Sequence, residues 1–129
     1  FVLRARISGS ENQAKLDEYY EMSKKFQDQN LDLIKEEFEA RKLGSQDSID
    51  NVARKLKSWT RRKYLYTTNF AINNADYEVS PYVALTELTD ANVTLLDTIN
   101  NSLSAEVRAS KYGKQLGEFI NSIKANQPE

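Results

Sequence analysis

Residues 48–71, SIDNVARKLKSWTRRKYLYTTNFA, decide the fold. Apolar or aromatic side chains return every three or four positions along this stretch, which is the period of one face of an α-helix. The only polar member of the series is Lys63, whose aliphatic stem can lie along that face with the ammonium group outside. The stretch therefore predicts a long amphipathic helix with the series Ile49, Val52, Leu56, Trp59, Lys63, Tyr66 and Phe70 on its buried side.

The preceding residues, 10–42, predict a second long helix. They contain no Gly or Pro and are rich in residues that favour helices. Ser10 and Gln13 have the spacing of a capping box at its start. Its predicted buried series is Tyr19, Met22, Phe26, Leu33 and Ala40, widened on one side by Leu16, Tyr20, Ile34 and Phe38.

A tight turn joins these two helices. Gly44 is suited to the left-handed residue that follows a helix, and Asp47 or Ser48 can cap the next helix. Two long helices with so short a connection predict an antiparallel hairpin.

Shorter helices are predicted after the hairpin. Residues 73–76, NNAD, break the helical pattern, and Ser80-Pro81 restarts it with a cap and a first-turn proline. Asp90 is the predicted cap of the next helix, and Ser104 and Ser110 begin two more. The fold class is therefore all-α, with a long hairpin and three or four shorter packed helices over residues 10–125.

The two ends of the chain predict different elements. Phe1, Leu3 and Ile7 alternate with Arg4 and Arg6, a pattern typical of a half-buried strand. Residues 1–9 are therefore expected to form the last strand of an upstream sheet domain, or alternatively an arm lying on the helices. An unpaired strand could also pair with a second copy and form a homodimer. Residues 126–129 are expected to begin a linker to a downstream domain.

Composition narrows the chemistry. The chain has no Cys and no His, so it lacks thiolate nucleophiles, zinc–thiolate ligands and the usual general base of hydrolases. We expect no catalytic residue, cofactor or metal site in it. Its 18 basic and 19 acidic residues nearly balance, which disfavours recruitment of nucleic acid by net charge. No apolar run approaches the roughly 18 residues that span a bilayer.

Residues 53–66, ARKLKSWTRRKYLY, combine cations with aromatic rings and could bind single-stranded nucleic acid. The alternative that we favour is pairing across the hairpin. It places Glu36 and Glu37 at the level of Arg54 and Lys55, Asp32 opposite Lys57 and Asp28 opposite Arg62, with Trp59 in the core. Tyrosines near the loop after residue 70 are expected to be more exposed. The candidate interaction surface is Arg54, Lys55, Arg61, Arg62, Tyr77 and Tyr82.

The order of landmarks resembles one protein family. ISGS at residues 7–10, the charged hairpin, SPYVALTEL at 80–88 and LSAEVRASKYGKQLGEFINSIKA at 103–125 are similar to the middle of bacteroidete-type thiol–disulfide oxidoreductases of the TlpA/ResA kind. The resemblance implies a β domain upstream and a thioredoxin-like domain downstream, whose Cys-x-x-Cys would follow Glu129. It also implies a periplasmic or cell-envelope location, often as a lipoprotein.

Three functions remain as hypotheses. The first is a non-catalytic spacer and docking module of such an oxidoreductase, with the downstream thioredoxin-like domain and a further protein as partners. The second is a free-standing helical adaptor that binds a protein through the hairpin. The third is a single-stranded nucleic-acid binder that uses residues 54–63.

Overall fold

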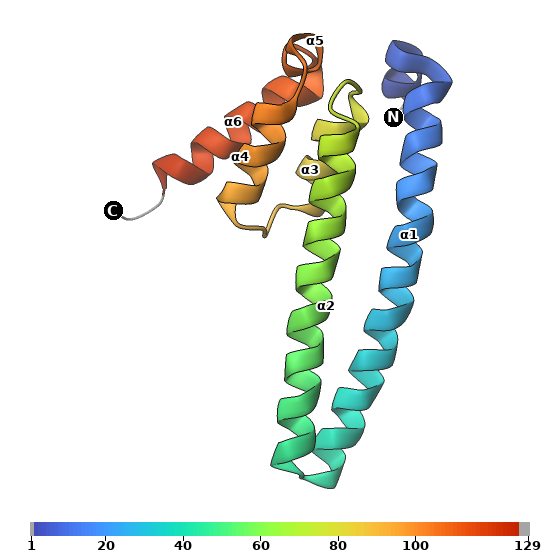
Figure 1. Cartoon of the computed structure of the whole chain (residues 1–129), viewed down its shortest axis with the longest axis vertical. Coiled ribbons are helices and arrows are strands. Elements are labelled where there is room, and N and C mark those ends of the chain that lie inside the picture. Colours follow the sequence, from blue (N-terminus) through green and yellow to red (C-terminus); the bar gives the residue numbers. More distant parts are fainter. Residues whose placement is uncertain (1, 127–129) are drawn as a thin grey trace. The chain divides into compact units, whose positions relative to one another are not determined.

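The computed structural model describes the backbone of residues 2–126 and the side chains of residues 11–126. This part of the chain is all-α, as predicted, with two long and four shorter helices and no β-strand (Figure 1). In chain order the helices are α1 (Val2–Leu43), α2 (Gln46–Asn73), α3 (Val79–Glu87), α4 (Val93–Ser102), α5 (Ala105–Arg108) and α6 (Lys111–Ala125).

The predicted turn at Gly44 connects α1 to α2. Gly44 has a φ of +71°, a left-handed conformation that glycine adopts without a side-chain clash. Its N–H donates to two carbonyls in the last turn of α1, each at 3.1 Å, and so ends that helix. The predicted caps, Asp47 and Ser48, lie inside α2 instead. The helix begins earlier because the Ser45 hydroxyl accepts from the Ser48 N–H at 3.3 Å.

The start of the chain differs from the prediction. Residues 2–9 are the first turns of α1 and do not form a strand or an extended arm. A helix pairs its backbone groups largely within the segment, whereas a strand needs a neighbouring strand, and the described residues offer none. Without a strand edge, the predicted strand-mediated homodimer loses its structural basis. Phe1 and residues 127–129 lie outside the described residues, and Asn126 is the C-cap of α6.

The chain forms two compact units, and α1 and α2 contribute to both. Residues 18–65, which we call the hairpin unit, contain the Gly44 turn and the adjoining parts of the two long helices. Residues 1–17 and 66–129 form the other, which we call the short-helix unit because it contains α3 to α6. The range 10–125, predicted as one helical domain, thus includes parts of both.

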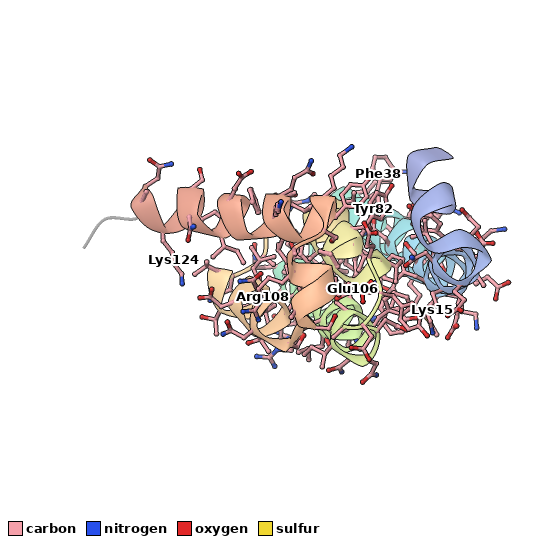
Figure 2. All side chains as sticks on the ribbon, turned by 90° about the horizontal axis from the view of Figure 1, so that it is seen from above. Lys15, Phe38, Tyr82, Glu106, Arg108 and Lys124 are labelled. Carbon is pink, nitrogen blue, oxygen red and sulfur yellow. The ribbon has the colours of Figure 1, made fainter. Side chains whose placement is uncertain are left out.

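In the short-helix unit, α6 packs against α3, α4 and α5. Gly113 brings the first turn of α6 so close to α5 that an added Cβ would lie 2.0 Å from the Val107 carbonyl oxygen. At the other end of α6, Lys124 reaches α4, where its Nζ is 2.8 Å from Asp97 Oδ2 (Figure 2). The core includes Val83, Ala84, Leu88, Leu96, Ile99, Leu103, Leu116 and Ile120.

Two predicted helix caps in this unit are confirmed. The hydroxyls of Ser104 and Ser110 each accept from the N–H three residues later, both at 3.2 Å, at the starts of α5 and α6. The cap of α4 is Asn92 and not Asp90, because α4 begins only at Val93. Asn92 Oδ1 accepts from the N–H two residues later at 2.8 Å.

The start of α3 is also different from the prediction. Ser80 and Pro81 lie inside the helix, which begins at Val79. The Val79 N–H donates to Asn12 Oδ1 of α1 at 2.9 Å, so a distant side chain supplies the cap. Ser80 is buried, and its hydroxyl donates to the Ala71 carbonyl of α2 at 2.7 Å.

Candidate protein-interaction surface

The six predicted surface residues are divided between the two units: Arg54, Lys55, Arg61 and Arg62 belong to the hairpin unit, and Tyr77 and Tyr82 to the short-helix unit. Arg54 and Arg61 do lie on one side of α2 together with Lys57, because their spacings of three and four residues repeat the helical turn. With two hydroxyl residues, Ser58 and Thr60, they line an open hollow of about 570 Å³. None of the three cations forms an ion pair within residues 11–126.

Lys55 and Arg62 are engaged elsewhere. Lys55 Nζ lies 2.8 Å from Glu36 Oε2, which confirms the predicted pairing of the two helices at this level. The pair is half-exposed, so its contribution to stability is at most about 1 kcal/mol. Arg62 donates to the Ser58 hydroxyl at 2.9 Å. Asp32 and Lys57, and likewise Asp28 and Arg62, were predicted to lie opposite each other, and within the described side chains neither couple forms an ion pair.

Tyr77 and Tyr82 belong to the short-helix unit and are half-buried. Lys15 Nζ lies 4.6 Å from the centre of the Tyr77 ring. A hydrogen bond with Glu11, followed by the charge of that carboxylate, raises the pKa of Tyr77 above its usual value. The Tyr82 ring packs edge-on against Tyr112 with centroids 5.2 Å apart. Both tyrosines therefore contact other side chains of their own unit.

Sequence reasoning missed an apolar row on α1. Leu31, Ile34 and Phe38 are 56%, 48% and 65% exposed, and spacings of three and four residues place them on one side of the helix. We call this row the α1 stripe. Ile34 and Phe38 were predicted to widen the buried face, and that prediction is wrong. They lie about 100° or more around the helix from Leu33 and Ala40, the members of the inward face at this level.

Exposed apolar side chains are concentrated in the hairpin unit. The stripe supplies half of the large ones in the described structure, and the other half also lie within residues 18–65. Scattered single residues of this kind are normal, whereas a contiguous apolar row is a candidate interaction surface. The full set is Tyr20, Leu31, Ile34, Phe38, Leu43 and Leu65.

One edge of the α1 stripe is basic. Lys24, Lys35 and Lys42 are exposed and lie eleven and seven residues apart, close to whole numbers of turns, so they share one side. They form no ion pair within the described residues. On the opposite edge Arg41 pairs with Glu37 at 3.2 Å. The three lysines thus line one edge of the stripe, and exposed carboxylates such as Asp28 and Glu39 follow them around the helix.

A second hollow adjoins the stripe and crosses the hairpin. Trp59 of α2 donates its indole N–H to the Phe26 carbonyl of α1 at 2.9 Å, and the two rings meet edge to face with centroids 6.4 Å apart. Trp59 was predicted as a core residue, but it is half-buried and borders open space. That space is about 400 Å³ and is lined by Phe26, Gln27, Asn30, Leu31, Trp59 and Lys63.

Comparison with protein-family models, curated proteins and solved structures finds no match to this chain. The site must therefore be interpreted from its own geometry.

The next features concern redox chemistry, metal binding and membrane spans. The chain has no cysteine, so it cannot itself carry out thiol–disulfide exchange. Within the described residues no three carboxylates or other ligating side chains are grouped to hold a metal ion. No described helix combines the length and the hydropathy needed to cross a bilayer.

Proposed function

We propose that this chain is a non-catalytic docking module whose α1 stripe binds an amphipathic helix of a partner protein. The stripe carries the proposal. Leu31, Ile34 and Phe38 have the i, i+3, i+7 spacing by which one helix docks on another, and they span about 10.5 Å along α1. Covering such a row removes apolar surface from water, which is the main driving force of most protein association.

The charge beside the stripe supports an acidic partner helix. If two copies packed their stripes together in antiparallel orientation, equivalent edges would meet and the lysine edges would repel each other. A parallel pair would bring the lysines to the opposite edge, where Glu37 is already paired with Arg41. A partner helix with Asp or Glu along one edge would instead complement Lys24, Lys35 and Lys42.

A display selection tests this proposal, with the whole chain as bait and a library of helix-forming peptides. Enriched peptides should combine apolar residues at three- and four-residue spacing with an acidic edge. Phe38→Ser should weaken their binding at least tenfold, as expected for the largest and most exposed side chain of the stripe. Leu43→Ser is the matched control, because Leu43 is 77% exposed but lies off the stripe. Lys35→Glu should weaken binding and reduce its dependence on salt.

Three results would contradict the proposal. The first is that enriched peptides bind the Phe38→Ser variant as well as the original chain. The second is a homodimer, seen by sedimentation, that Phe38→Ser abolishes, since the stripe would then be a self-interface. The third is salt-sensitive binding of a labelled oligothymidylate that is lost in Arg61→Ala, which would favour the nucleic-acid alternative. Circular dichroism should verify that each variant keeps its helical content.

The family resemblance supports a more specific form of the proposal. In that form the chain is a spacer and docking module of a periplasmic or envelope thiol–disulfide oxidoreductase, and a thioredoxin-like domain follows it. Its support is the order of sequence landmarks, which is clearest from Ser80 to Ala125. The parent reading frame should then encode Cys-x-x-Cys downstream of Glu129. A frame without it would leave the free-standing adaptor, which uses the same stripe.

A further inference from the structure

We infer that the hollow beside Trp59 is an anchor site that takes one aromatic side chain of the docked helix. The inference rests on the proposed function, because Leu31 belongs to both features: it begins the α1 stripe and lines the hollow. A helix lying along the stripe would therefore pass the mouth of the hollow. One side chain at that level can enter while its neighbours cover Ile34 and Phe38.

The walls of the hollow suit an aromatic ring. Phe26 and Trp59 meet at an interplanar angle of 72°, so an entering ring finds both an edge and a face beside the apolar side chain of Leu31. Aromatic rings favour such edge-to-face and offset contacts. The volume of about 400 Å³ lies near the lower end of the roughly 300–1,000 Å³ typical of ligand pockets, which suits a side chain better than a large cofactor.

The polar groups that line the hollow indicate which residues of the partner helix would lie next to its aromatic side chain. Gln27 and Asn30 supply amides that can both donate and accept. Lys63 Nζ lies 5.6 Å from the centre of the Trp59 ring, which places a cation beside the hollow. An aromatic residue next to Asp or Glu would match this lining.

The hollow is formed before any partner binds. The hydrogen bond from Trp59 Nε1 to the Phe26 carbonyl fixes the indole of α2 to the backbone of α1. Because the indole N–H is already used, a ligand would contact the ring surface of Trp59. A fixed aromatic wall lowers the entropy lost when the partner side chain is immobilised, so binding is stronger than to a mobile wall.

The fluorescence of Trp59 can test this, because it is the only tryptophan in the chain. The probe is a synthetic, tryptophan-free peptide of about five helical turns with an apolar row, a Glu edge and one Phe at the anchor position. A matched peptide carries Ala in place of that Phe. The Phe peptide should change Trp59 emission saturably and should bind at least tenfold more tightly than the Ala peptide.

Two variants of the chain distinguish binding of the aromatic side chain in the hollow from non-specific hydrophobic binding. Asn30→Phe places a ring in the hollow and should abolish the difference between the two peptides. Gln29→Phe adds the same ring at an exposed neighbouring position outside the lining, and it should preserve the difference. Unchanged circular dichroism should accompany both variants.

The outcomes distinguish the two proposals. If the Phe and Ala peptides bind equally, leave Trp59 emission unchanged and are both weakened by Phe38→Ser, the anchor is overturned while stripe docking stands. If neither peptide binds the original chain, the docking function and the anchor both fail. A tenfold preference that persists in Asn30→Phe would also overturn the anchor, because the ring would then be bound elsewhere.

Discussion

Two glycines in α6 should respond to alanine in opposite directions. Gly113 and Gly117 lie one turn apart, and alanine is normally about 0.8–1 kcal/mol better than glycine inside a helix. At Gly117 no atom outside the helix's own backbone lies within 4 Å of an added Cβ. Gly117→Ala should therefore stabilise the protein by about 0.5–1 kcal/mol.

Gly113→Ala should instead destabilise it, because the space is taken by backbone. The added Cβ would lie 2.0 Å from the Val107 carbonyl oxygen and 2.7 Å from that of Arg108, so no rotamer change relieves the overlap. Moving α6 away from α5 would strain the hydrogen bond from the Ser110 hydroxyl to the Val107 carbonyl, and the same hydroxyl caps α6 by accepting from the Gly113 N–H at 3.2 Å. Overpacking of about 1–3 kcal/mol and a weakened cap of about 1 kcal/mol outweigh the helical gain, which leaves a net loss of about 2 kcal/mol.

Thermal unfolding followed by circular dichroism measures both effects. For a protein of this size, 1 kcal/mol shifts Tm by roughly 3–4 °C. Gly113→Ala should lower Tm by roughly 6–8 °C, and Gly117→Ala should raise it by roughly 2–4 °C. A Gly113→Ala protein that melts at or above the original temperature would refute the close packing of α6 on α5. Equal losses in both variants would show that the effect does not come from the approach of Val107.

Substitutions at three further positions test single interactions by urea unfolding. Gly44→Ala should cost about 1–2 kcal/mol from its left-handed φ alone, since nothing lies within 4 Å of the added Cβ; an unchanged midpoint would argue against that turn. Asn12→Ala should cost about 1–3 kcal/mol because it removes the acceptor of the buried Val79 N–H. Glu78→Gln should stabilise the protein by about 1 kcal/mol at pH 7: burial, then the charge of Glu106, raises the pKa of Glu78, and its buried Oε2 accepts no hydrogen bond. The pKa of Glu78 is higher in the folded than in the unfolded protein, so lowering the pH through the folded pKa protonates Glu78 and stabilises the original chain. The advantage of Glu78→Gln over the original chain should therefore shrink by about pH 4. An equal advantage at pH 7 and pH 4 would contradict the raised pKa of Glu78.

Local sequence signals predicted the helices well and their first residues less well. The apolar series of residues 49–70 and Gly44 were sufficient for the hairpin, and Ser104 and Ser110 for two starts. Where two capping side chains lie within two positions of each other, as with Asp90 and Asn92, composition does not choose between them. The start of α3 was beyond local reasoning, because its acceptor lies 67 residues away on another helix.

The N-terminal prediction failed for a related reason. Alternation of apolar and basic residues over seven positions fits a strand, but Leu, Arg and Ala also favour a helix. The pattern shows which side of a helix or strand is apolar. Whether a helix or a strand forms depends on where the backbone N–H and C=O groups find hydrogen-bond partners. With no partner strand in the described chain, residues 2–9 pair their backbone by continuing α1.

The candidate site was missed because an apolar residue on a broad helical face can be either core or surface. In the hairpin unit only two helices are present, so within that unit each can bury one side against the other. Helix α1 carries apolar side chains over a wider arc than that side, and Leu31, Ile34 and Phe38 are the excess. The same shortage of neighbours leaves Trp59 half-buried beside an open hollow. If a third helix were packed inside the hairpin unit, the same apolar residues of α1 would be core. The number of helices that pack on α1 decides between the two cases, and no local sequence pattern contains that number.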